Sequence, residues 1–269
     1  MAHFYNCKDT TDPSFEPDIE TPAKARKVNK VYPSVTTVLG IVKDAFLDSI
    51  YKPRMMTDLA RKNPFLPWQE LERMTYGFRK HPATNEDIPS SEFGTAVHKT
   101  IEDMIESLIW DRMRELPEGR EYDDWAEPFY QWVLDNDVKP IACERIIADN
   151  RIKIAGSVDF IGHDSDGKVF LADYKCRSCR DGKGKFYPKD CKQLAIESVM
   201  LARKLKLDYF PKVRSVCIDT NTAEHYHYEW SDDEFNHYFE CAKLSAKTYW
   251  VERMTPKPKK NKKNKNKNG

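Results

Sequence analysis

The distribution of apolar residues along the chain predicts a domain in which helices and short strands alternate. After Gly94, apolar residues recur at steps of three and four, which places them on one face of a helix. A second helix is predicted over residues 124–136, where tryptophan and phenylalanine recur, and two more over 190–204 and 232–253. The apolar face of the first helix consists of Val97, Ile101, Met104, Ile105, Leu108 and Ile109.

Between the second and third of these helices, the pattern changes to short apolar and β-branched segments bounded by polar turns, which predicts strands. The strands expected there are residues 141–148, 152–161 and 169–176. His163–Lys168 (HDSDGK) supplies the turn before the last of them. A strand over 213–219 follows the third helix, with 225–230 as a candidate hairpin partner. This order of elements predicts a mixed α/β core.

The two ends of the chain differ from this core. Residues 1–30 are polar and acidic, contain prolines and show no apolar periodicity, so we expect disorder there. Order is expected to begin at Val31, where the pattern fits either a helix or a strand. The proline-rich segment 62–91 predicts loops with helical fragments, and the Lys/Asn-rich tail 255–269 is expected to be disordered. One domain over residues 31–254 is therefore predicted.

Composition narrows the class of protein. The 269 residues are 40% apolar and 32% charged, and the chain has no uninterrupted apolar run of about 18 residues, so we expect no membrane-spanning helix. The N-terminus lacks the pattern of a secretory signal. The seven cysteines are odd in number and irregularly spaced, which favours free thiols over disulfides. The expected location is the cytoplasm, that of the host if the protein is viral.

The net charge of +1 conceals an uneven distribution. Seven lysines and no acidic residue fall within 255–269, which leaves a formal charge of −6 on residues 1–254. An acidic body does not suit binding to nucleic acid over the whole surface. Contact with nucleic acid is therefore expected in a local groove, assisted by the basic tail.

The candidate chemistry lies in GSVDFIGHDSDGKVFLADYK, residues 156–175. Asp173 and Lys175 stand two apart on a predicted strand and therefore face the same side. Asp159, on the preceding strand, is expected to approach Asp173 across a short hairpin. Two such carboxylates can hold a hard divalent cation, and the lysine can orient water or offset charge on a phosphate. The same residue types also occur as solvated strand ends, although an unpaired charge within VFLADYKC would be costly to bury.

A wider set of motifs resembles the PD-(D/E)xK nuclease superfamily, and within it the RecB-type and CRISPR-associated exonucleases and their phage relatives. The motifs occur in the family's order over about residues 94–200: GTAVH (94–98), CER (143–145), AGSVDFIG (155–162), LADYK (171–175) and Gln193. The resemblance implies a restriction-endonuclease-like core, a mixed central sheet flanked by helices, with N-terminal helical and loop additions.

The resemblance also implies roles for individual residues. His98, Asp159 and Asp173 would be ligands of Mg²⁺ or Mn²⁺, together with the Tyr174 carbonyl, and Glu144 would be a water-mediated or second-metal ligand. Lys175 would orient the attacking water, and Gln193 would contact the scissile strand or Lys175. The imidazole ligand shifts the preference somewhat towards Mn²⁺.

Three further features bear on this interpretation. Glu197 stands where the family often has tyrosine, which puts a DNA contact in doubt. Some relatives of the superfamily carry an iron–sulfur cluster held by four cysteines, three of them near the C-terminus. Cys176, Cys179 and Cys191 instead follow the predicted catalytic strand directly, and strand alternation directs Cys143 and Cys176 into the core, so we expect no cluster. The basic loop 177–189 would contact DNA phosphates at the mouth of the site, unless it is an ordinary solvated loop.

The predicted function is therefore a metal-dependent DNA exonuclease of recombination, repair or phage DNA processing, acting on DNA ends or single strands. A structure- or end-specific endonuclease, a catalytically silent DNA-binding module on the same fold, and a structural metal or iron–sulfur protein are the alternatives. The sequence does not decide the polarity of digestion or the preference for single- or double-stranded DNA. It also leaves open whether the protein forms a homo-oligomer or binds replication and recombination proteins.

Overall fold

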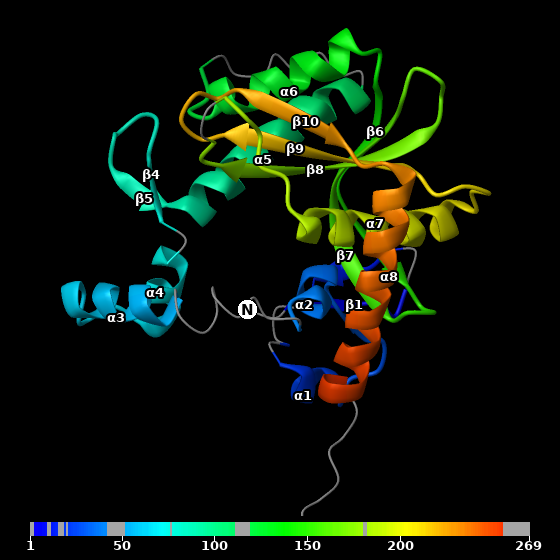
Figure 1. The fold of residues 1–269 in the computed structure, drawn as a ribbon, viewed down its shortest axis with the longest axis horizontal. Coiled ribbons are helices and arrows are strands. Elements are labelled where there is room, and N and C mark those ends of the chain that lie inside the picture. The colour runs from blue at the N-terminus through cyan, green and yellow to red at the C-terminus, as the bar shows by residue number, and fades with distance from the viewer. Residues whose placement is uncertain are drawn as a thin grey trace, which may run out of the picture.

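The centre of the molecule is a five-stranded mixed sheet with helices on both faces (Figure 1). The computed structural model describes residues 3–9, 12–15, 19, 21–41, 52–75, 77–110, 119–179 and 182–254. In spatial order β10-β9-β8-β7-β6, the strands are His225–Glu229, Lys212–Asp219, Val169–Arg177, Ile154–His163 and Lys139–Asp149. The predicted mixed α/β class is confirmed, and each predicted strand of this core is present within a few residues of its expected bounds.

The sheet divides into two parts that separate near its middle. β6 and β7 form a long antiparallel pair, and β8 pairs in parallel with β9 from Phe170 to Arg177. By contrast, β7 and β8 pair only from Phe160 opposite Ala172 to His163 opposite Val169. Beyond Phe160 and Ala172 the two strands diverge, and the residues next in line are Asp159 and Asp173. The β9–β10 hairpin agrees with the predicted pairing.

Two helices cover each face of the sheet (Figure 1). On one face lie α5 (Ser90–Ile109) and α6 (Asp123–Asp135). On the other lie α7 (Pro188–Leu205), which connects β8 to the parallel strand β9, and α8 (Asp232–Tyr249), which continues as a π-helical turn to Met254. The helix that was predicted to follow Gly94 is α5. It begins at Ser90, so Gly94 lies inside it.

The apolar interior follows this layering. One cluster joins α5 and α6 to β8 through Val97, Ile101, Phe129 and Tyr174. The other joins α7 and α8 to alternate residues of β8, including Val169 and Leu171. Because successive side chains of a strand point to opposite faces, Asp173 and Lys175 belong to the α7 side, as Leu171 does.

The expectation of disorder over residues 1–30 is wrong for the part of that segment that the structure describes. β1 (Phe4–Asn6) pairs with both β2 (Ser14–Phe15) and β3 (Val31–Pro33), and Phe4 and Cys7 are completely buried. A short helix, α1 (Pro22–Ala25), precedes β3, and α2 (Val35–Leu39) follows it and packs on α7 and α8. The anchoring comes from pairing with a distant strand, which local periodicity cannot reveal.

Residues 52–89 extend to one side of the sheet (Figure 1). They form α3 (Lys52–Lys62), α4 (Trp68–Met74) and a hairpin of β4 (Phe78–Lys80) and β5 (Asp87–Pro89). α4 lies in the segment for which helical fragments were predicted, whereas α3 and the hairpin were not predicted. The tail 255–269 lies outside the described residues, so its predicted disorder stays a prediction. Among the described helices, none combines the length and apolar character needed to cross a membrane.

Two partly buried histidines of β10 predict a loss of stability in acid. His225 Nε2–H donates a hydrogen bond of 2.7 Å to the Trp125 carbonyl, and the His227 ring stacks on Trp132 with 4.6 Å between ring centroids. Burial lowers the pKa of each histidine to about 4. Below its ordinary pKa of about 6.5 the unfolded chain therefore binds protons that the folded chain does not.

We expect the free energy of unfolding to fall between pH 6.5 and pH 4, by about 1 kcal/mol for each histidine after allowance for solvent access. Urea denaturation at a series of pH values measures this. His225→Gln/His227→Phe should flatten the pH dependence in that window relative to wild type. An identical pH dependence in the variant would contradict the assignment.

Candidate metal centre

The predicted site residues converge where β7 and β8 diverge. Lys175 Nζ lies 2.5 Å from Asp173 Oδ1 and 3.7 Å from Asp159 Oδ2, so the lysine bridges the two strands. Asp159 Oδ2 also accepts a hydrogen bond of 3.0 Å from the backbone N–H of Tyr174. The three residues expected at the centre of the site are therefore together, and Asp173 and Lys175 share one face as the alternation predicted.

Asp173 is the most buried member, with 1% of its surface exposed. Its Oδ1 accepts hydrogen bonds from Lys175 and, at 3.1 Å, from Gln193 Nε2. Its Oδ2 is buried and has no hydrogen-bond partner among the described residues. Burial raises the pKa of Asp173 to about 7. A buried carboxylate oxygen without a partner is costly, and a bound cation would satisfy it.

A cluster of one imidazole and two carboxylates, His98, Glu144 and Asp159, adjoins the Asp173–Lys175 pair. His98 Nδ1 lies 3.4 Å from Glu144 Oε1 and 3.9 Å from Asp159 Oδ2. One ligand atom from each of these three residues lies within 4.8 Å of the others, a spacing at which they could hold a metal ion. His98 comes from α5, Glu144 from the edge strand β6 and Asp159 from β7, so three separate elements supply the cluster.

Mutual electrostatics favour the charged forms of this cluster. Burial lowers the pKa of His98, but the carboxylates of Asp159 and Glu144 outweigh it and raise that pKa above its ordinary value. Burial raises the pKa of Glu144, yet the hydrogen bond from His98 prevails and the pKa is lowered. For Lys175, burial is likewise outweighed, here by Asp173 and Asp159, so its pKa is raised and the amine stays protonated.

Glu144 has an unusual backbone. Its φ is +46°, a left-handed conformation that side chains other than glycine seldom adopt. In the β6–β7 pair, Cys143 lies opposite Phe160 and Arg145 lies opposite Val158. Glu144, between them, therefore lies across from Asp159. The hydroxyl of Ser157 donates a hydrogen bond of 3.0 Å to Glu144 Oε2. Strain of this kind often occurs where a side chain must be presented for function.

The strain predicts a difference between two variants that both lack the carboxylate. Glycine adopts positive φ without penalty, whereas alanine does not, so Glu144→Gly should be more stable than Glu144→Ala by about 0.5–1 kcal/mol. Urea denaturation of the two proteins measures this difference. The opposite order of stability would show that residue 144 does not adopt the left-handed conformation.

Gln193 is held between two carboxyl groups. Its Nε2 lies 3.1 Å from Asp173 Oδ1 and 3.2 Å from Glu197 Oε1. Glu197 is 2% exposed, and burial raises its pKa well above the ordinary value. The position at which the family often has tyrosine thus holds a buried acid that contacts Gln193. Gly156 makes room for it, because an added Cβ would meet Val35 at 3.0 Å and Glu197 Oε1 at 3.4 Å.

Sequence reasoning missed two side chains that support the site, the hydroxyl groups of Ser157 and Tyr174. Ser157 stands two residues before Asp159 on β7, so strand alternation could have placed it on the same side. Tyr174 is fully buried, and its hydroxyl donates to the Asp159 carbonyl at 2.8 Å while its own carbonyl lies 3.0 Å from His98 Nε2. The Tyr174 carbonyl, expected as a metal ligand, is thus beside the cluster but paired with His98.

The basic loop after β8 is partly committed to internal contacts. Arg177 pairs with Asp190 at 2.7 Å and donates to the Lys185 carbonyl, while Lys185 donates to the Ser178 carbonyl. These contacts tie the end of β8 to the first turn of α7. In the described part of the loop, Lys183 and Lys189 are exposed. These two cations suit the predicted contact with DNA phosphates.

The cysteines considered for an iron–sulfur cluster are distributed over both faces of the sheet. Cys191 belongs to the apolar cluster on the α7 side, whereas Cys143 and Cys176 pack against the cluster on the α5 side. Burial raises the pKa of Cys176, Cys179 and Cys191 to about 12 in each case, which favours neutral thiols. The core orientation predicted for Cys143 and Cys176 is confirmed, and the absence of a cluster stays a prediction.

The residues present suit a hard divalent cation. His98, Glu144 and Asp159 could hold an ion between them, and the neighbouring Asp173 has a buried carboxylate oxygen with no hydrogen-bond partner among the described residues. Oxygen-rich ligation of this kind is typical of Mg²⁺ and Mn²⁺. The geometry does not identify which ion binds.

Comparison with known proteins adds little to this geometry. No protein-family model matches the chain, and no curated protein is similar to it. Among solved structures, one described as "Crystal structure of SSO0001" shares 15% identity, with coverage of 78% of this chain and 83% of that one. Its TM-score of 0.32 is too low to carry an argument about fold or function.

Proposed function

We propose that the protein is a divalent-metal-dependent deoxyribonuclease with a restriction-endonuclease-like core. In this proposal it digests DNA as an exonuclease. The observation that carries the proposal is the buried Asp173, next to the His–Glu–Asp cluster. Its Oδ1 pairs with Lys175, and its Oδ2 has no hydrogen-bond partner among the described residues. A module that only binds DNA has no need for such a costly arrangement of buried charge.

In this proposal, Asp159, Asp173 and Glu144 hold the cation together with His98. When bound, the cation would activate water and stabilise the leaving oxygen of a phosphodiester. Lys175 Nζ, fixed between the two aspartates, orients the attacking water and offsets negative charge that develops on the phosphate. Gln193, held by Asp173 and Glu197, orients Asp173 or contacts the scissile strand.

The direct test uses wild-type protein and end-labelled linear DNA, single- and double-stranded, with Mg²⁺, Mn²⁺ or EDTA. We expect degradation that requires the cation and releases mononucleotides or short products from an end. Covalently closed circular DNA of the same sequence is the matched substrate without ends. Cleavage of the circle would favour the endonuclease alternative, and intact linear DNA with both metals would contradict the proposal.

A further inference from the structure

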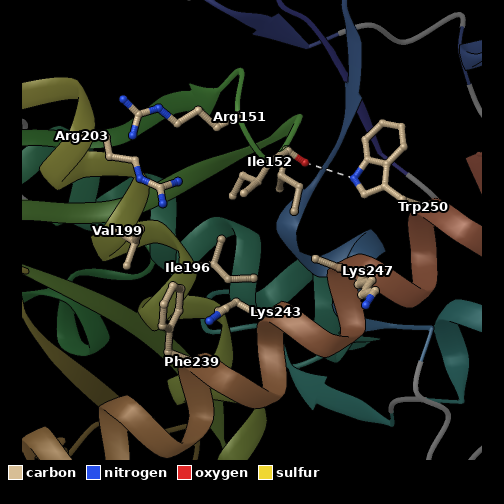
Figure 2. A pocket seen from close by; sticks show the side chains of 11 residues that line it. Arg151, Ile152, Ile196, Val199, Arg203, Phe239, Lys243, Lys247 and Trp250 are labelled. Carbon is tan, nitrogen blue, oxygen red and sulfur yellow. Dashed lines mark hydrogen bonds between the residues drawn. The ribbon is translucent and has the colours of Figure 1, made fainter.

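A second recess, remote from the carboxylate cluster, combines an apolar floor with a basic rim. It lies between the β6–β7 turn, α7 and α8, and has a volume of about 420 Å³, within the range of sites that take ligands. Figure 2 shows its walls. The floor consists of Ile152, Ile154, Ile196, Val199 and Phe239. The Trp250 indole N–H donates to the Ile152 carbonyl at 3.1 Å and fixes one end.

Four cationic side chains surround this floor. Arg151 and Arg203 lie on one side, and Lys243 and Lys247 come from α8 on the other (Figure 2). Two of these charges are already compensated, because Arg203 pairs with Asp149 at 2.6 Å and Lys243 with Glu240 at 2.8 Å. Arg151 and Lys247 are exposed and form no ion pair with any described residue. The rim therefore carries uncompensated positive charge on a body whose formal charge is −6.

We propose that this recess binds an acidic peptide segment of a partner protein, with a large apolar side chain in the recess and carboxylates on Arg151 and Lys247. Buried apolar anchors ringed by complementary charge are the usual basis of such recognition. The chain's own continuation after Met254 does not suit the role, because its seven lysines would be repelled by the same rim.

The floor favours a peptide over a nucleic acid. A nucleobase carries polar edges that need hydrogen-bond partners when buried, and the side chains of the floor, four aliphatic residues and Phe239, offer none. Single-stranded nucleic acids usually bind by stacking on exposed aromatic rings. Here the Trp250 indole is held against Ile152 at the end of the recess. The inference does not depend on the proposed nuclease activity.

The test is fluorescence anisotropy with the full chain and the labelled peptide Asp-Asp-Asp-Asp-Leu-Phe. We expect saturable binding that weakens about tenfold or more when Leu-Phe is replaced by Ser-Ser, or when the aspartates are replaced by asparagines. Equal binding of all three peptides would overturn the proposal, as would no binding of the first.

Three protein variants locate the binding. Arg151→Glu/Lys247→Glu should weaken binding about tenfold or more, whereas Lys139→Glu/Lys168→Glu makes the same change of charge at the far end of the β6–β7 pair and should leave it unchanged. Ala246→Trp fills the recess without changing charge and should have an effect similar to that of the first pair. Thermal melting verifies that each variant is folded.

Hexathymidylate serves as the nucleic-acid probe in the same assay. It should not compete with the peptide for the recess. Competition with wild-type protein, together with direct binding of labelled hexathymidylate that is lost in Ala246→Trp, would show that the recess is a nucleic-acid site and would overturn the peptide proposal. Loss of the peptide's binding in the Lys139→Glu/Lys168→Glu variant would also overturn it, because the contact would then be nonspecific.

Discussion

Asp173→Asn should reduce metal-dependent DNA degradation by about 1,000-fold or more, because it removes a negative ligand oxygen from the centre of the site. The amide has nearly the same shape as the carboxylate, so packing around residue 173 should be preserved. The free energy of unfolding should be unchanged or higher, since a buried and incompletely paired carboxylate is removed. Initial rates on end-labelled linear DNA with Mn²⁺ measure the first effect, and urea denaturation the second.

Asp166→Asn is the matched control for this substitution. Asp166 is exposed in the turn between β7 and β8, at the opposite end of the strands from the site. That variant should retain wild-type activity. Activity of Asp173→Asn within a few-fold of wild type would remove Asp173 from the reaction.

Lys175→Gln should separate catalysis from metal binding. The amine lies 2.5 Å from Asp173 and 3.7 Å from Asp159, so it competes electrostatically with any cation held by those carboxylates. Its removal should therefore leave Mn²⁺ affinity equal or tighter, while the rate of DNA degradation falls by about 100-fold or more. Isothermal titration with Mn²⁺ and single-turnover digestion give the two quantities.

Lys168→Gln, in the exposed β7–β8 turn, is the control and should alter neither quantity. If Lys175→Gln instead loses Mn²⁺ affinity and activity together, the lysine acts by holding the site in shape. If neither changes, the proposed role of Lys175 is wrong.

The sequence predicted the central part of the site because the relevant constraints are local. Asp173 and Lys175 are two residues apart on one strand, and Asp159 is one hairpin away, so strand alternation and turn chemistry bring them together. His98 and Glu144 followed from the order of motifs in the nuclease superfamily that the chain resembles. Helix and strand positions in the core depended on strong periodicity and were close to those observed.

Other features depend on contacts that only the folded chain creates. The N-terminal strand Phe4–Asn6 is anchored by pairing with Val31–Pro33, a contact between segments far apart in sequence. The positive φ of Glu144 and the unpartnered oxygen of Asp173 have no sequence signature. Arg177 belongs to the loop that was predicted to contact DNA phosphates, yet it forms an ion pair with Asp190 within the protein, a contact that the sequence does not reveal.

The measurement that tests the account most directly is anomalous diffraction from crystals of wild-type protein soaked in Mn²⁺. We predict a manganese peak in contact with Asp159 and with Asp173 Oδ2, the oxygen without a hydrogen-bond partner in the described part of the chain, near His98 and Glu144. The same soak of Asp173→Asn crystals should weaken or abolish the peak. A manganese peak elsewhere, with none among these carboxylates at concentrations that saturate binding in solution, would contradict the central claim.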